Sequence, residues 1–171
     1  MTDPDALAQN MRIALRRLAQ TVAVISTRHE NRRIAMAATA VNSLSLDPPA
    51  MMVAVNRTAS IYPALSAGGR FCINILAEGQ GAVARACGGA LKGEDRFGVG
   101  TWQDRDGVPV LEGAQACLLC RQDGFMDYGS HGLFIGRVLA VEMSDEIAPL
   151  VYADGRFSGL HFSECRSESR A

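Results

Sequence analysis

The stretch from Ala37 to Ser45, AATAVNSLS, combines very small side chains with several hydrogen-bonding groups. Small side chains allow a flat ring to approach the backbone, and Thr39, Asn42 and Ser43 offer polar atoms to the edge of that ring. A flavin needs such donors along its pyrimidine edge and near N5, where they tune its electronics. The alternative is a strand that leaves through a Ser- and Thr-rich turn before Asp47-Pro48-Pro49, and both interpretations stay open on this stretch alone.

A second candidate is the segment Asn56–Ser60, NRTAS, which follows an apolar run and precedes an expected helix. The N–H groups at a helix N-terminus carry partial positive charge, and an adjacent guanidinium with hydroxyls completes a phosphate site. Arg57 and Ser60 are therefore candidate phosphate ligands. An ordinary capped helix with a surface arginine is the more frequent meaning of this pattern in isolation.

His131 follows Gly129 and Ser130 and stands directly before the apolar run 132–138. A histidine at the end of a strand, near the mouth of a barrel, can hydrogen-bond a nicotinamide or donate a proton to a reduced flavin. The alternative is a solvated turn histidine, which is the usual case. His29 and His161 receive no role.

No metal or nucleophilic motif competes with these candidates. The sequence contains no G-x-S-x-G, H-E-x-x-H or Walker A pattern. Five cysteines without regular spacing form no disulfide framework, which agrees with a reducing compartment. Cys117 and Cys120 form a C-x-x-C within an expected strand, where positions three apart face opposite sides, so neither a shared metal nor a redox pair is expected there.

Length and composition predict one globular domain. The chain has 171 residues, 48% of them hydrophobic, and a formal net charge of -1. The near balance of charge lacks the basic footprint of a nucleic-acid-binding protein. No signal peptide and no run of about 20 apolar residues is present, so we expect a cytoplasmic protein without a membrane segment.

The elements that must position these residues are mostly strands. Short apolar and β-branched runs, separated by polar or Pro/Gly breaks, occur at 21–27, 33–40, 50–56, 70–76, 114–122 and 132–142. Their spacing is too tight for repeated βαβ crossovers, each of which needs a helix of about ten residues. The sequence therefore predicts a mainly β fold, an antiparallel barrel of about six strands.

Helices and loops complete the expected domain. Leu7, Met11, Leu15 and Leu18 predict an amphipathic helix over 6–19 that packs on the barrel. Short helices are expected at 61–67, capped by Ser60, and at 79–87, and a long functional loop at 88–113. The predicted organisation is an N-terminal helix (1–20), the barrel domain (21–162) and a flexible tail (163–171).

Several ordered motifs resemble the short-chain flavin reductase family, the split-barrel reductase components of two-component flavin monooxygenases such as the 4-hydroxyphenylacetate 3-monooxygenase system. The resemblance runs from about Arg12 to Leu160 and rests on MAATAVNSLSLDPP, NRTASIYPAL, GRFCINIL, DRF, PVLEGA and GSH. It implies an FMN-binding split β-barrel of Greek-key type and a homodimer with FMN or FAD near the subunit interface. It also implies NADH or NADPH as hydride donor and a freely diffusing reduced flavin that reaches a monooxygenase partner.

The resemblance also assigns roles to individual positions. Residues that would face the isoalloxazine and ribityl chain are Ala37, Ala38, Thr39, Ala40, Asn42 and Ser43. Arg57 and Ser60 would hold the phosphate, Arg96 and Phe97 would border the flavin, and Gly129 and His131 would belong to the nicotinamide site. The family's usual glycine and threonine are here Ala35 and Ala37; the latter lacks a hydroxyl, although backbone donors at Ala37 and Thr39 remain.

Two other functions fit the same residues. One is a flavin-binding oxidase of the pyridoxamine-phosphate-oxidase-like type, or a haem-associated relative, on a similar barrel. The other is a non-enzymatic flavin-binding protein that stores flavin or senses redox state. The sequence leaves open FMN or FAD, NADH or NADPH, and flavin as substrate or prosthetic group.

Overall fold

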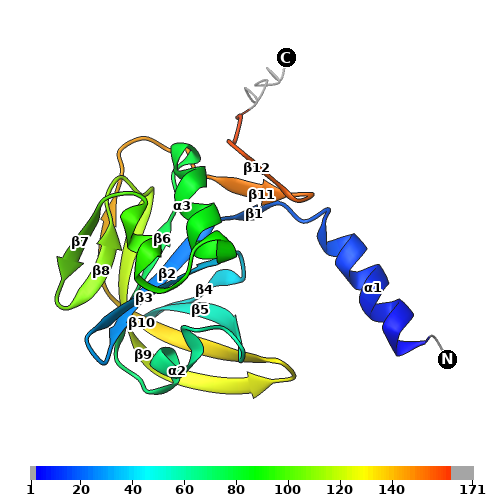
Figure 1. Ribbon diagram of the computed structural model, residues 1–171, viewed down its shortest axis with the longest axis horizontal. Coiled ribbons are helices and arrows are strands. Elements are labelled where there is room, and N and C mark those ends of the chain that lie inside the picture. Colours follow the sequence, from blue (N-terminus) through cyan, green and yellow to red (C-terminus); the bar gives the residue numbers. More distant parts are fainter. Residues whose placement is uncertain (1–2, 163–171) are drawn as a thin grey trace, which may run out of the picture.

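The structure, a computed structural model, describes residues 3–162, so the predicted tail 163–171 lies outside the described residues. Strands dominate the chain, as Figure 1 shows. The elements are α1 (Pro4–Leu15), β1 (Gln20–Thr21), β2 (Ala23–His29), β3 (Arg32–Ala38), β4 (Val41–Leu46), β5 (Pro49–Asn56), α2 (Tyr62–Ser66), β6 (Arg70–Ile75), η1 (Glu78–Gln80), α3 (Gly81–Arg85), η2 (Ala86–Ala90), η3 (Gly93–Gly98), β7 (Trp102–Arg105), β8 (Val108–Leu111), β9 (Ala116–Tyr128), β10 (His131–Met143), β11 (Val151–Ala153) and β12 (Arg156–Ser158).

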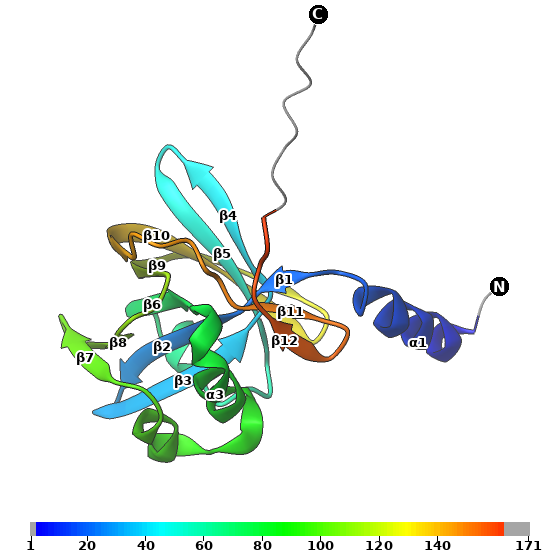
Figure 2. The same ribbon diagram turned by 90° about the horizontal axis from the view of Figure 1, so that it is seen from above.

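The main sheet contains seven strands in the order β3-β2-β6-β9-β10-β5-β4, and its pairings are antiparallel. Its two edge strands, β3 and β4, are consecutive in the chain, so the sheet curls round until its edges meet at the short connection through Thr39 and Ala40. The β4–β5 hairpin projects from one side of this barrel (Figure 2). The predicted mainly β, antiparallel split barrel is confirmed.

The core lies on both faces of the sheet because side chains alternate along each strand. Val24 and Cys72 pack in one cluster, and their chain neighbours Ile25 and Ile73 pack in the other. Cys117 and Cys120 likewise fall into different clusters, as the C-x-x-C spacing on a strand predicts. Within residues 3–162 no group of three His, Cys, Asp or Glu side chains is placed to hold a metal ion.

The segment 88–113 is not the structureless loop that the sequence predicted. It contains η3 and the β7–β8 hairpin, and it contributes Phe97, Val108, Val110 and Leu111 to the core. Phe97 stands alone between Arg96 and Gly98, and the run 108–111 has only four residues and contains Pro109, so neither has the length of the other apolar runs. Their burial is what gives the segment a defined structure.

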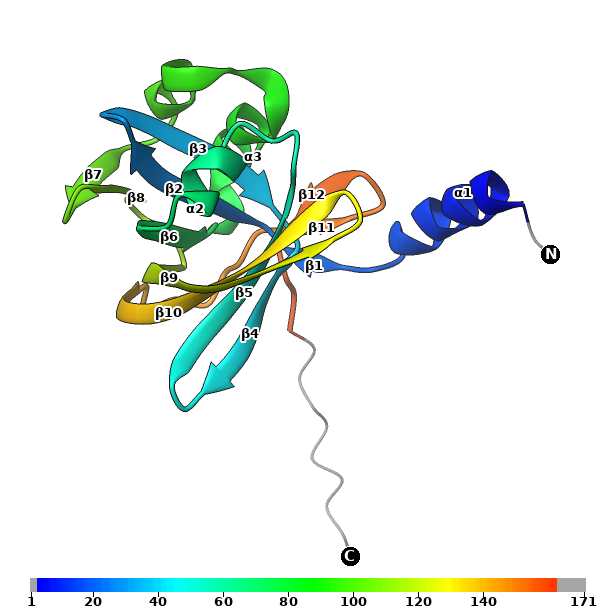
Figure 3. The same cartoon turned by 90° about the horizontal axis from the view of Figure 1, so that it is seen from below.

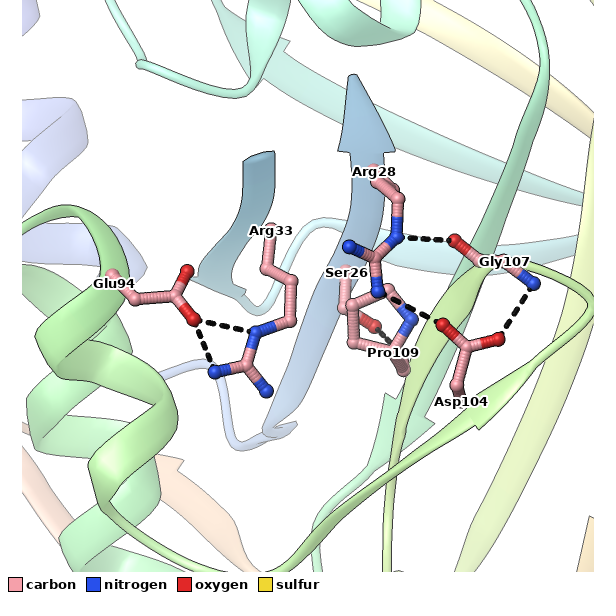
Figure 4. A network of polar contacts seen from close by, with 7 residues as sticks. All are labelled: Ser26, Arg28, Arg33, Glu94, Asp104, Gly107 and Pro109. Atoms are coloured by element: carbon pink, nitrogen blue, oxygen red, sulfur yellow. Dashed lines mark hydrogen bonds and ion pairs between the residues drawn. The ribbon is translucent and has the colours of Figure 1, made fainter. Parts of the chain in front are cut away.

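A polar network attaches the β7–β8 hairpin to the barrel. The Ser26 hydroxyl on β2 donates to the carbonyl of Pro109, 2.5 Å away, and Arg28 bonds both Gly107 O (3.1 Å) and Asp104 Oδ2 (2.9 Å), as Figure 4 shows. The N–H of Gly107 and the guanidinium of Arg28 hold the pKa of Asp104 below its ordinary value, because both favour the ionised carboxylate. The hairpin therefore has a fixed position over β2.

Helix α1 differs from its prediction in packing. It ends at Leu15, and none of its residues is buried. Figures 1 and 3 show it projecting away from the barrel, so the expected packing of this helix on the barrel of its own chain is wrong. Leu7 and Met11 are 60% and 61% exposed, which leaves an apolar stripe without a partner in the described chain. No helix among the described residues is long and apolar enough to cross a bilayer.

The short helices form where they were expected, with one different cap. Helix α2 lies within the predicted range 61–67, and η1 and α3 coincide with the predicted helix at 79–87. The N-cap of α2 is Ile61, which forms no side-chain cap, so the predicted capping role of Ser60 is wrong. The turn is stabilised instead by the Asn56 carboxamide oxygen, which accepts from the N–H and the hydroxyl of Thr58, both at 2.9 Å.

Candidate functional site

Strand β3 forms one wall of two neighbouring hollows. We call the first the alanine hollow; it has a volume of about 430 Å³ and lies at the C-terminal end of β3, under α3 and η2. Most of its lining side chains are small, and its two aromatic residues come from the β11–β12 hairpin. It is lined by Val22, Ala37, Ala38, Thr39, Ala84, Arg85, Gly88, Ala90, Tyr152 and Phe157.

The second hollow, which we call the arginine hollow, lies at the other end of β3. Its volume is about 250 Å³ and it contains three guanidinium groups and one carboxylate. The lining residues are Arg32, Arg33, Ile34, Ala35, Ser60, Gly93, Glu94 and Arg96. With formal charges of +3 and -1, this hollow carries a net +2 and favours an anion.

In the alanine hollow η2 and β3 approach each other closely, because small residues face each other there. A Cβ placed on Gly88 would lie 3.9 Å from the Cβ of Ala37, with no other atom within 4 Å. A larger side chain at either position would fill the space between η2 and β3. The rings of Tyr152 and Phe157, with centroids 5.4 Å apart and planes tilted by 56°, contribute aromatic surface to the lining. The shape and lining fit a planar ring.

Two arginines fasten η3 to β3 at the arginine hollow. Arg33 on β3 forms an ion pair with Glu94, with 2.7 Å between Nε and Oε1, and Figure 4 shows this pair bridging the two elements. Arg96 on η3 donates hydrogen bonds to the carbonyl of Leu91 (2.9 Å) and to the carbonyl of Ala35 on β3. These contacts keep the wall that contains Gly93 and Glu94 against the edge strand.

The segment Asn56–Ser60 connects the arginine hollow with the β9–β10 hairpin. At one end Ser60 lines the hollow, and at the other Asn56 is paired in register with His131. The N–H of Arg57 donates to the carbonyl of Ser130 at 3.0 Å. The structure thus brings together the NRTAS and GSH motifs, which are distant in the sequence.

Five of the twelve predicted site residues line the two hollows. Ala37, Ala38 and Thr39 line the alanine hollow, and Ser60 and Arg96 line the arginine hollow. Ala40 lies at the turn into β4, where its carbonyl accepts from Ala54 N (3.0 Å). Five further members of the predicted set are exposed and line neither hollow: Asn42, Ser43, Arg57, Gly129 and His131.

Phe97 has a different position from the others. It is only 6% exposed and packs edge-on against Trp102, with ring centroids 4.9 Å apart. The guanidinium carbon of Arg33 lies 4.4 Å from the centroid of its ring. Phe97 therefore makes a cation–π contact with Arg33 and lines neither hollow.

Sequence reasoning missed several lining residues. Arg85 was assigned only to the predicted helix 79–87, and Gly88 only to the predicted loop 88–113. Tyr152 and Phe157 lie in strands of three residues each, which are too short to show an alternation of apolar and polar residues. Arg32 and Arg33 resembled ordinary surface charges beside a turn. The Ala-rich face of the predicted helix 79–87 was the one available signal, because small side chains at that spacing permit close approach to a strand.

The fold and the two hollows together indicate the class of protein to which this chain belongs. An antiparallel split barrel with a narrow small-residue hollow beside a cationic one is suited to bind a planar ring that carries a phosphate. The flavin reductase like domain matches residues 15–161, and the chain belongs to this family. The family membership that the motifs predicted is confirmed.

Individual relatives agree with this assignment. The chain is 35% identical over 157 residues to the reductase component of the FADH(2)-dependent resorcinol hydroxylase of Rhizobium sp. (strain MTP-10005), covering 90% of this chain and 88% of the relative. It is 36% identical over 147 residues to the FMN reductase (NADH) RutF of Variovorax paradoxus (85% and 82% covered). The NADH:FAD oxidoreductase SgcE6 of Streptomyces globisporus, solved in complex with NAD and FAD fragments, superposes with a TM-score of 0.85 at 25% identity (98% and 99% covered).

Proposed function

We propose that this chain is an NAD(P)H:flavin oxidoreductase that reduces FMN or FAD and supplies the reduced flavin to a partner monooxygenase. The observation that carries the proposal is the match of the flavin reductase like domain over residues 15–161. Relatives named as an NADH-dependent FMN reductase and as the reductase component of a hydroxylase support it. So does the pairing of a ring-sized hollow with a cationic one along a single strand.

We place the isoalloxazine ring beside Ala37, Ala38 and Thr39, and the phosphate in the arginine hollow with Ser60. Alanine side chains let the ring approach the β3 backbone, whose edge is not covered by another strand of the main sheet. The connection through Ala40, with Asn42 and Ser43 on β4, borders the ring at the end of β3 that lies away from the arginine hollow. Arg96 contributes by holding η3 and β3 together, since its donors already bond Ala35 and Leu91.

The nicotinamide belongs beside the β9–β10 hairpin in this proposal. A bound flavin would accept the hydride that the reduced nicotinamide donates. The chain's own task is to bind and orient. His131 is exposed at the start of β10, and its Nδ1 lies 2.9 Å from the Ser130 hydroxyl, which fixes the ring orientation. Nε2 is then left to hydrogen-bond the nicotinamide nucleotide.

Replacing His131 by alanine is expected to raise KM for NADH by about tenfold, the loss of roughly one hydrogen bond. The affinity for flavin should stay within about twofold of wild type, because His131 lines neither hollow. Stopped-flow reduction and flavin fluorescence titration measure the two quantities separately. His161→Ala, exposed beyond β12 and lining neither hollow, is the matched control. Equal losses in NADH use and flavin binding would contradict this role.

The proposed assembly is a homodimer. Apolar side chains remain exposed on α1 and along β4, among them Leu44 and Leu46 at 49% and 88%. A monomer rarely leaves such a stripe uncovered, and a second copy of the chain is the occupant that the family resemblance implies.

Met11→Glu, in the middle of the α1 stripe, is expected to convert a dimer into a monomer of 18.3 kDa in analytical ultracentrifugation. A carboxylate cannot enter an apolar interface without a partner. Gln9→Glu adds the same charge on the opposite face of the helix and should leave the dimer intact. A wild-type chain that sediments as a monomer would refute the assembly.

Steady-state oxidation of NADH and NADPH with added riboflavin, FMN or FAD tests the proposed function directly. We expect flavin-dependent consumption of at least one nucleotide. Anaerobic mixing with NADH should bleach the flavin absorbance. Tight flavin binding without nucleotide consumption would overturn the reductase proposal in favour of a store or sensor, and bleaching only by another donor would favour an oxidase.

A further inference from the structure

The arginines near the two hollows differ in whether their charge is already neutralised. Arg57, which the family resemblance places on the flavin phosphate, forms an ion pair with Asp127 at 2.9 Å. The same carboxylate accepts from the Tyr62 hydroxyl at 3.0 Å. Arg57 lines neither the alanine hollow nor the arginine hollow. Its guanidinium is therefore directed toward the tip of the β9–β10 hairpin.

Within the arginine hollow, two of the three guanidiniums are also engaged. Arg33 is paired with Glu94, and Arg96 donates to the carbonyls of Leu91 and Ala35. Arg32 is different: it is the first residue of β3, it is exposed, and no hydrogen bond or ion pair engages its side chain within residues 3–162. It shares the hollow with Ser60.

We propose that Arg32, with Ser60, binds the flavin 5′-phosphate, and that Arg57 is a positioning residue for the hairpin that carries His131. This inference rests on the proposed function, since it assigns residues to the flavin and nicotinamide sites of that reaction. It departs from the role that the family resemblance gives to Arg57.

The physical reason is the free energy needed to displace an existing ion-pair partner of an arginine before a phosphate can bind it. A phosphate that binds Arg32 gains a charge-assisted hydrogen bond without breaking another ion pair. A phosphate that binds Arg57 must first displace Asp127 or accept its repulsion. The Glu94 carboxylate also faces the arginine hollow, but Arg33 neutralises it, so the net charge there stays positive.

Arg57 has two contacts that orient the hairpin. Its backbone N–H donates to the Ser130 carbonyl at 3.0 Å, and its side chain holds Asp127 on β9, four residues before His131. Loss of the guanidinium removes the second contact and loosens the end of β9 next to the proposed nicotinamide site. The result should appear in nicotinamide use, because no phosphate contact is lost.

Flavin fluorescence quenching measures the dissociation constants of FMN and riboflavin, which differ only by the phosphate, for Arg32→Ala, Arg57→Ala and the control Arg121→Ala. Arg121 on β9 is exposed and lines neither hollow. We expect Arg32→Ala to weaken FMN binding by about 10- to 100-fold, with riboflavin changed less than about twofold. Arg57→Ala and the control should keep the wild-type ratio of the two constants.

Kinetics then separate the role of Arg57 from a general loss of structure. Arg57→Ala should raise KM for NADH several-fold with the dissociation constant of FMN unchanged, and Arg57→Lys should recover part of the loss because it restores a cation beside Asp127. Loss of the FMN preference in Arg57→Ala, or equal weakening of both flavins in Arg32→Ala, would overturn the inference. A wild-type chain that binds neither flavin would instead refute the proposed function.

Discussion

The Gly88→Leu variant is expected to bind flavin about 100-fold more weakly than wild type, a loss of about 2.7 kcal/mol, while its fold stays intact. Gly88 lies opposite Ala37 in the alanine hollow, and a Cβ there would meet only the Ala37 Cβ at 3.9 Å. Gly88 has no positive φ, so leucine is compatible with its backbone. The added side chain therefore occupies the space of the ring without straining the chain.

The affinity is measured by quenching of flavin fluorescence, and the fold by circular dichroism and the urea midpoint. Gly79→Leu is the matched control, because a Cβ at Gly79 meets no atom within 4 Å and the residue lines neither hollow. It should bind flavin like wild type. Full affinity in Gly88→Leu would show that the ring binds elsewhere and would remove the alanine hollow from the site.

The Asn74→Ala variant is expected to lose about 3 to 5 kcal/mol of unfolding free energy. Asn74 on β6 is completely buried. Its Nδ2 donates to Val24 O and to Ser26 Oγ, both at 2.9 Å, and its Oδ1 accepts from Leu111 N at 2.8 Å. Alanine removes the partner of Leu111 N and the donor to Val24 O, while Ser26 Oγ keeps its bond to Pro109 O, and each buried group left unpaired costs about 1 to 3 kcal/mol.

Urea denaturation monitored through Trp102 on β7 reports this loss directly, because the network joins the β7–β8 hairpin to β2 and β6. Asn42→Ala, on the exposed strand β4, serves as control and should change stability by less than about 0.5 kcal/mol. If Asn74→Ala lost less than about 1 kcal/mol, the hairpin would have to be held mainly by its apolar contacts, and the network would be dispensable.

The barrel could be predicted because its strands leave a local signal. Along β2, β6 and β9, neighbouring side chains point to opposite faces of the sheet, and both faces are buried. Such strands appear in the sequence as short continuous apolar runs. The separation of Cys117 from Cys120 followed from the same period. The position of α1 could not be predicted this way, because an apolar stripe shows that a partner exists without showing whether the partner is the same chain.

The site was only partly predictable for a related reason. Motifs located Ala37–Thr39, Ser60 and Arg96, because small residues and turn residues are chosen by local geometry. The partners of the arginines depend on strands that meet only after folding, as Arg57 with Asp127 and Arg33 with Glu94 show. An arginine looks the same in a sequence whether its charge is neutralised or available to a ligand.

By itself, then, the sequence determined the family, the strand content and several of the segments that line the two hollows, since all three depend on residue types at short spacings. The tertiary structure decided that the segment 88–113 is folded, that Tyr152 and Phe157 line the alanine hollow, and which arginines form ion pairs. These features depend on contacts between residues distant in the chain, and such contacts leave no period or motif to detect.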